Sequence, residues 1–134
     1  MDGVARAGSS GQGTAGGRQM TSPFREMLHS LMRQRGVLAT MLVDEHEGMI
    51  IDSILQVGQD GDRVAALAAS LHRKARKSAE AAGMGAVSYM QLDAESGRIC
   101  AAGRGAMVLV VVAAPSANIG LVRVETLKAV QALP

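Results

Sequence analysis

The residues of this chain that could bind a metal ion are three histidines, one cysteine and a short acidic turn. His29, His46 and His72 lie in three separate predicted elements, and none has the paired spacing that zinc sites use. Cys100 has no neighbouring thiol. The acidic turn at 44–47 could hold a cation, but such a turn is more often solvated. We therefore predict that the chain binds no metal ion and no other cofactor.

Covalent catalysis needs a Ser or Cys side chain beside a base and an orienting group. Cys100 lies beside Ala101 and Ala102 in a predicted strand, which favours a small buried side chain over a nucleophile. Tyr89 lies in the middle of another predicted strand, where it fits a core or an interface. No two carboxylates have the pattern of an acid and a base. These observations predict that the protein is not an enzyme.

Nucleotide phosphates are commonly held by the backbone amides of a loop with the pattern Gly-x-x-x-x-Gly-Lys-Ser/Thr after a strand. The sequence contains no such string. Gly11-Gln12-Gly13 has neither a strand before it nor a helix after it. The chain is therefore not itself a GTPase of this class.

The most basic segment runs from His72 to Lys77, in the second half of a predicted long helix. One interpretation is a solvated helix face, and another is a docking patch for the acidic surface of a protein partner. Nucleic acid or a membrane has less support, because only Phe24 and Tyr89 could stack on bases or anchor the segment in a bilayer. We predict neither as a partner. If the segment docks a protein, the residues expected to face it are His72, Arg73, Arg76 and Lys77.

The same helix, predicted over Asp62–Ala82, is apolar on more than one side in its first half. One face carries Val64, Leu67, Ala68, Leu71, Ala75, Ala79 and Ala82. A helix that is apolar all round is usually buried on more than one side. The small side chains on the opposite side allow close approach of a second helix, such as one from another copy of the chain. The residues expected at this interface are Ala65, Ala66 and Ala69.

Apolar periodicity and turn residues divide the chain into alternating helices and strands. Residues 1–21 are rich in glycine and serine and are predicted to be a disordered tail, whereas residues 22–134 are predicted to form one domain. Because Ala106–Ala114 is apolar on both faces, it should be a central strand covered by helices on both sides. The predicted elements are helix Phe24–Arg33, strands Gly36–Asp44 and Met49–Leu55, helix Asp62–Ala82, strands Ala86–Asp93, Arg98–Ala102 and Ala106–Ala114, and a helix from Ser116 or Asn118 to about Leu133.

This order predicts an α/β (α+β) domain with a five-stranded antiparallel sheet and helices on both faces. Hydrophobic residues make up 48% of the chain and charged residues 19%, a balance that excludes a wholly disordered protein. The net charge of +2 is too small to indicate nucleic-acid binding. The longest apolar run is far shorter than the ~20 residues of a membrane span. With one cysteine and no secretory signal pattern, we expect a cytoplasmic protein.

The order of these elements and three motifs resemble the Roadblock/dynein light-chain domain, which is Roadblock/LAMTOR-type and longin-like, over about Phe24 to Leu133. The first motif is two apolar strands joined by a turn that ends in glycine, at 36–55. The second is Val64–Ala69, which opens the long helix. The third is the strand Met107–Ala113 followed by Asn118-Ile119-Gly120-Leu121-Val122-Arg123, an Asn-x-Gly-x-x-Arg unit typical of the family. The hairpin turn is one residue longer than the Asp-x-x-Gly of many members.

The resemblance implies homodimers or paired heterodimers, in which the third strands join edge to edge and the central helices lie side by side. On this chain the third strand places Ser88, Tyr89 and Met90 at the dimer interface. Bacterial members commonly partner a Ras-like small GTPase. The resemblance therefore implies a homodimeric adaptor that binds such a GTPase and modulates its nucleotide cycle or localisation. It could act by ordering the switch loops of its partner.

Two other functions stay open on the sequence. A sensor of small ligands would need an enclosed cavity with convergent polar groups. Asp52, Ser53 and Ser88 are the candidates for such inward-facing groups. A purely structural dimerisation scaffold within a larger assembly would need no cavity, so a well-packed structure would count against the sensor alone.

Overall fold

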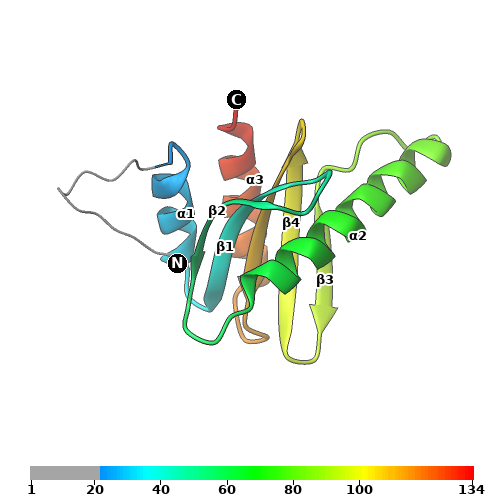
Figure 1. The fold of residues 1–134 in the computed structure, drawn as a ribbon. Coiled ribbons are helices and arrows are strands. Elements are labelled where there is room, and N and C mark those ends of the chain that lie inside the picture. Colours follow the sequence, from blue (N-terminus) through cyan, green and yellow to red (C-terminus); the bar gives the residue numbers. More distant parts are fainter. Residues whose placement is uncertain (1–21) are drawn as a thin grey trace.

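The computed structural model describes residues 22–134, which form three helices and five strands (Figure 1). This order confirms the predicted arrangement α-β-β-α-β-β-β-α. The disordered tail predicted for residues 1–21 lies outside the described residues. The elements are α1 (Arg25–Met32), β1 (Val37–Asp44), β2 (Ile50–Leu55), α2 (Gly61–Ala81), β3 (Met90–Ala94), β4 (Gly97–Arg104), β5 (Met107–Ala113) and α3 (Ile119–Gln131).

All five strands join one antiparallel sheet in the order β2-β1-β5-β4-β3. β5 lies in the centre, and its residues 108–113 are buried. Met41 of β1 pairs with Val110 of β5, and Leu42 pairs with Leu109. The central place of β5 confirms the position predicted from its apolar run, because a strand covered on both faces needs apolar side chains on both.

Helices cover both faces of the sheet, with α1 and α3 on one face and α2 on the other (Figure 1). Adjacent residues of a strand point their side chains to opposite faces. Leu42, Leu109 and Val111 therefore pack with α1 and α3. Their strand neighbours pack with α2, and these are Met41, Val108 and Val110. The domain thus has two apolar layers, one on each side of the sheet.

The two longer helices begin at side-chain caps. Asp60 accepts a hydrogen bond from the N–H of Arg63 over 3.2 Å at the start of α2. Asn118 accepts one from the N–H of Leu121 over 3.1 Å at the start of α3. Such a cap stabilises a helix by about 1 kcal/mol. Of the two caps considered for the last helix, Asn118 is therefore the one used.

The start of β3 differs from its predicted position. The strand expected from Ala86 begins at Met90. Gly83 and Gly85 have φ angles of 73° and 86°, so the chain turns at both residues directly after α2. Because the end of α2 extends past β3 in Figure 1, the residues up to Tyr89 are needed to bring the chain back to the sheet.

Candidate protein-binding surface

Glu45, directly after β1, holds the basic side chains of α2 around one buried carboxylate. Glu45 is 7% exposed. Arg76 donates from Nη2 to Oε1 over 2.7 Å and from Nε to Oε2 over 3.1 Å. His72, which is 4% exposed, donates from Nδ1 to Oε2 over 2.7 Å. Both carboxylate oxygens are therefore engaged, and the β1–β2 turn is bound to the middle of α2.

Arg73 strengthens the same attachment through the main chain. Its Nη1 donates to the carbonyl of Glu45 over 2.8 Å and to that of His46 over 3.4 Å. The hydrogen bond from Arg76 holds the pKa of Glu45 below its ordinary value of 4.5, against the opposing effect of burial and with a further contribution from His72. The carboxylate is thus charged at neutral pH, as an acceptor of three N–H donors must be.

His72 fits this site because a glycine faces it from β4. A Cβ atom at Gly103 would lie 2.6 Å from Cε1 of His72 and 2.9 Å from its Nε2. The imidazole ring is also held from the other side by Glu45. The close approach of the ring to the strand therefore requires glycine at this position.

We expect Gly103→Ala to lower the free energy of unfolding by about 1–3 kcal/mol, because the held His72 ring cannot move away from the added methyl group. Denaturant unfolding followed by circular dichroism measures the effect. Gly120→Ala in α3 is the control, since its Cβ would meet only Oδ1 of Asn118, at 3.6 Å. Equal stabilities of the two variants would contradict the proposed fit of His72 against β4.

The structure changes which basic residues of α2 can contact a partner. His72 is buried between Glu45 and Gly103, which corrects the prediction that it faces a partner. Arg73 and Arg76 are half-buried and bound to the hairpin turn. Lys77 is exposed, and so is Lys74, which belongs to the same basic segment. The fully exposed basic residues of the segment are therefore the two lysines.

A shallow apolar hollow lies between α2 and the edge of the sheet formed by β3 and β4. Leu67 on α2 is 44% exposed, and Leu92 on β3 is 37% exposed. Large apolar side chains gathered at an open surface mark a region that binding would cover. The hollow is lined by Val64, Leu67, Leu92, Ala94, Gly97, Arg98, Ile99 and Val112. We call four of these residues the apolar strip: Val64, Leu67, Leu92 and Ile99.

The alanines expected at a helix–helix interface have a different role. Ala65 and Ala69 are buried in the domain's own core, against the sheet, which corrects their assignment to an interface with a second helix. Ala66 is exposed. The small side chains allow α2 to lie close to the β1–β2 turn, where a Cβ at Gly48 would be 3.4 Å from Cα of Ala66. Within the protomer, the neighbours of these alanines are the sheet and the β1–β2 turn, and not a second helix.

The three residues predicted near the edge of β3 lie in different surroundings. Ser88 is exposed. Tyr89 packs on the layer of α1 and α3, and the guanidinium of Arg123 lies 4.7 Å from the centre of its ring. Met90 packs on the layer of α2. Burial is the main cause that raises the pKa of Tyr89 above its usual range. Tyr89 therefore joins β3 to α3 within one protomer.

Sequence reasoning missed two features of this surface. Glu45 was considered only as part of a solvated acidic turn. Its partners lie 27 residues or more away along the chain, so no local pattern indicates the pairing. Half of the apolar strip could be recognised from the sequence, because helical periodicity places Val64 and Leu67 on one apolar face of α2. The sequence did not indicate that these two residues lie beside an open hollow with Leu92 and Ile99.

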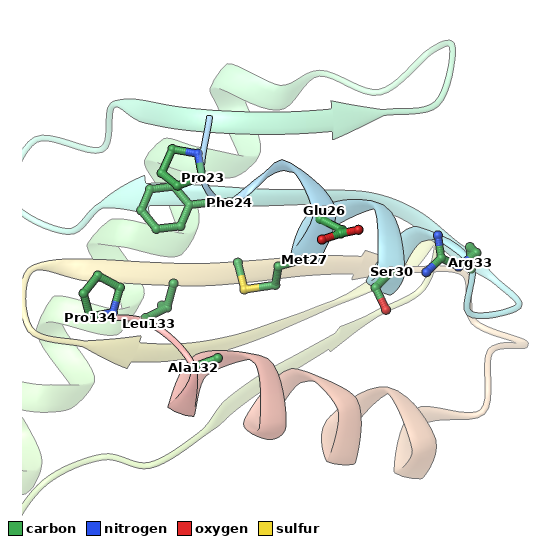
Figure 2. A pocket seen from close by; sticks show the side chains of 9 residues that line it. All are labelled: Pro23, Phe24, Glu26, Met27, Ser30, Arg33, Ala132, Leu133 and Pro134. Atoms are coloured by element: carbon green, nitrogen blue, oxygen red, sulfur yellow. The ribbon is translucent and has the colours of Figure 1, made fainter. Parts of the chain in front are cut away.

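A second, open pocket lies between α1 and the residues that follow α3 (Figure 2). Of the groups expected to converge in a ligand cavity, neither Asp52, Ser53 nor Ser88 lines it. Asp52 is paired with Arg25 instead. The pocket is lined by Pro23, Phe24, Glu26, Met27, Ser30, Arg33, Ala132, Leu133 and Pro134. The three groups named for a ligand sensor therefore do not converge in this pocket.

The groups considered for metal and covalent chemistry are dispersed. Within residues 22–134, no three side chains of His, Cys, Asp or Glu gather as metal ligands. Cys100 is fully buried, and its burial raises the pKa of the thiol, which disfavours the reactive thiolate. None of the helices in this part of the chain has the length and apolar character needed to cross a membrane.

The family model described as the Roadblock/LC7 domain matches residues 23–113. The chain belongs to the Roadblock/LC7 family. This confirms the resemblance found in the sequence. Roadblock/LC7 proteins are generally non-enzymatic adaptors, and the match indicates no catalytic family. The match ends before α3, so the Asn118–Arg123 unit lies outside it.

Known proteins of similar sequence or structure agree with this assignment. MJ1340 of Methanocaldococcus jannaschii is 28% identical over 105 residues, which span 78% of this chain and 91% of that protein. The Roadblock/LC7 domain from Streptomyces avermitilis has a TM-score of 0.73 at 18% identity, covering 82% of this chain and 93% of that one. The gliding protein MglB from Thermus thermophilus has a TM-score of 0.72 at 20% identity, covering 86% and 90%. The Roadblock fold is thus shared at low sequence identity.

Proposed function

We propose that this Roadblock/LC7 protein is a non-enzymatic homodimeric regulator that binds a Ras-like small GTPase in the cytoplasm and modulates its nucleotide cycle or localisation. Its family membership supports the class of partner. One observation carries the dimer: the apolar strip stays half exposed beside an outer strand of the sheet. A monomer would leave these apolar side chains in water.

The second copy fits at the edge of β3. β3 is the last strand on its side of the sheet, so its outer backbone groups have no strand partner within residues 22–134. Pairing with β3 of a second copy would satisfy those groups and remove an exposed edge. The same approach would bring the two α2 helices together and cover Leu67 and Leu92. Ser88, Met90 and Ala66 remain proposed contacts of this dimer.

The GTPase is proposed to dock on the second half of α2, which extends past β3 in Figure 1. Lys74 and Lys77 are exposed there, and they suit an acidic patch on the partner. Arg73 and Arg76 contribute from beside them but also hold the turn of Glu45. Charge reversal at either arginine would therefore disturb the fold, which makes the two lysines the sharper probe.

We expect the double variant Lys74→Glu with Lys77→Glu to bind the GTPase at least about tenfold more weakly, because reversed charges at a rim slow association. The measurement is a titration with purified Ras-like GTPases of the same organism, loaded with GDP or a non-hydrolysable GTP analogue. Lys128→Glu is the control, since Lys128 is a 70% exposed residue on α3, across the sheet. Unchanged affinity of the double variant would exclude this patch. A dimer that binds none of the GTPases would support the structural scaffold instead.

A further inference from the structure

Arg73 differs from the other arginines of α2 in what its side chain contacts. Arg76 pairs with the carboxylate of Glu45, and Arg63 pairs with that of Asp60. Arg73 bonds to main-chain carbonyls of the β1–β2 turn, which lies beside α2 in Figure 1. Within residues 22–134, no Asp or Glu side chain forms an ion pair with Arg73. Its positive charge therefore has no opposite charge in contact in this part of the chain.

The hydrogen bonds of Arg73 use only one nitrogen of its guanidinium. Both bonds come from Nη1, to the carbonyl of Glu45 over 2.8 Å and to that of His46 over 3.4 Å. The donors on Nε and Nη2 have no acceptor within residues 22–134. These two nitrogens lie on one edge of the planar group, and together they form a fork that matches the two oxygens of a carboxylate.

Arg76, which lies one turn further along α2, shows what this fork binds. Its Nε donates to Oε2 of Glu45 over 3.1 Å, and its Nη2 donates to Oε1 over 2.7 Å. His72 also donates to Oε2 of Glu45, over 2.7 Å. The carboxylate of Glu45 therefore faces Arg76 and His72, and only its main-chain carbonyl contacts Arg73. The same fork on Arg73 could accept a carboxylate from outside the domain.

The attachment of Arg73 to the turn prepares its fork for binding. A long side chain loses conformational freedom when a partner fixes it, and this loss weakens binding. Arg73 is half-buried and already held at Nη1, whereas Lys74 and Lys77 are exposed beside it. A lysine attracts an acidic surface as a hydrated point charge, while an arginine fork binds one oxyanion in a defined geometry. The lysines therefore favour association, and Arg73 determines which group is contacted.

We propose that Arg73 is a specificity-determining residue, whose Nε–Nη2 fork binds the carboxylate of one Asp or Glu side chain on the GTPase. This inference rests on the proposed function, since it takes the GTPase as the partner of α2. A carboxylate on the partner's surface fits better than a phosphate of its nucleotide. To extend into a nucleotide site, the guanidinium would have to break both bonds of Nη1 to the turn. The β1–β2 turn thereby holds the fork at the docking surface.

Titration of Arg73→Lys with the GTPases at two salt concentrations tests the proposal, because lysine keeps the charge and loses the fork. We expect binding at least about fivefold weaker than native at both ~0.1 M and ~0.5 M salt, since a half-buried contact is screened little. The effect of Lys74→Glu with Lys77→Glu should instead shrink at the higher salt, because those charges are exposed. Arg104→Lys is the matched control and should bind as the native protein does. Arg104 also donates to a main-chain carbonyl, that of Gln131 over 3.2 Å, but it lies at the end of β4.

A double-mutant cycle then identifies the carboxylate. Each surface Asp or Glu of the GTPase is changed to Asn or Gln and titrated against the native protein and Arg73→Lys. We expect one change to weaken native binding at least about fivefold and to leave the binding of Arg73→Lys unaltered. A loosened turn alone would weaken the binding of all GTPase variants equally. Native affinity of Arg73→Lys, or the absence of any coupled carboxylate, would overturn this proposal and leave the proposed function standing. A native protein that binds none of the GTPases would overturn both.

Discussion

Glu45→Gln is expected to lower the free energy of unfolding by about 2–3 kcal/mol. The amide can accept through one atom only, so its NH₂ group faces a donor of His72 or Arg76 at hydrogen-bond distance. The two side chains then lose the charge that both of them contact. Thermal unfolding followed by circular dichroism measures the loss, which corresponds to a fall in Tm of roughly 10 °C.

Glu47→Gln is the matched control for this variant. Glu47 is an exposed residue of the same turn, and only its backbone N–H bonds within it, to the carboxylate of Asp44 over 3.3 Å. We expect its stability to stay within about 0.5 kcal/mol of the native protein. A large loss in the control would show that any change in the turn is costly, and it would remove the special role assigned to Glu45.

The difference in free energy of unfolding between the native protein and Glu45→Gln should become smaller as the pH is lowered. The folded pKa of Glu45 lies below its ordinary value of 4.5. The charged carboxylate therefore contributes its full stability above about pH 4.5, and this contribution disappears as the pH falls through the folded pKa. Unfolding measured between about pH 6 and pH 3 should show this difference narrowing on the acidic side. A constant difference would contradict the charge-based attachment of the turn.

The fold could be predicted because its boundaries are marked locally. The uninterrupted run of β5 could occupy only the centre of a sheet covered on both faces, and Asn118 is a good helix cap directly after it. The start of β3 could not be predicted as well. The apolar alternation from Ala86 resembles a strand, but the distance from the projecting end of α2 back to the sheet is a tertiary property.

The orientation of α2 could not be read from apolar periodicity. The buried residues are Gly61, Ala65, Ala68, Ala69 and His72, which turns the helix by roughly a quarter turn from the predicted face at 100° per residue. Alanine is compatible with both a core and an exposed position, so a helix with alanine on every side has no unique buried face. The hydrogen bond between His72 and Glu45 turns the His72 side of α2 toward the sheet. Glu45 is 27 residues away along the chain, so a local pattern does not indicate this contact. The same ambiguity hid the apolar strip. The buried face of α2 consists mainly of small residues, which leaves the larger Leu67 exposed at the surface.

Leu67→Lys is expected to weaken self-association through the β3 edge at least about a hundredfold. In the proposed dimer this side chain enters the interface between the two α2 helices, beside Leu92. A lysine there must lose its hydration without gaining an acidic partner, and the two-fold axis brings in a second lysine. Sedimentation equilibrium at micromolar protein concentration measures the loss of the dimer.

Leu121→Lys is the matched control for this prediction. Leu121 is 46% exposed, close to the 44% of Leu67, but it lies on α3, on the other face of the sheet. The two variants therefore make the same chemical change at equal exposure, and only the change on α2 should shift the protein to a monomer. A dimer that survives Leu67→Lys, or one that both variants disrupt equally, would place the interface elsewhere. Loss of GTPase binding together with the dimer in Leu67→Lys would further indicate that the partner contacts both copies of α2.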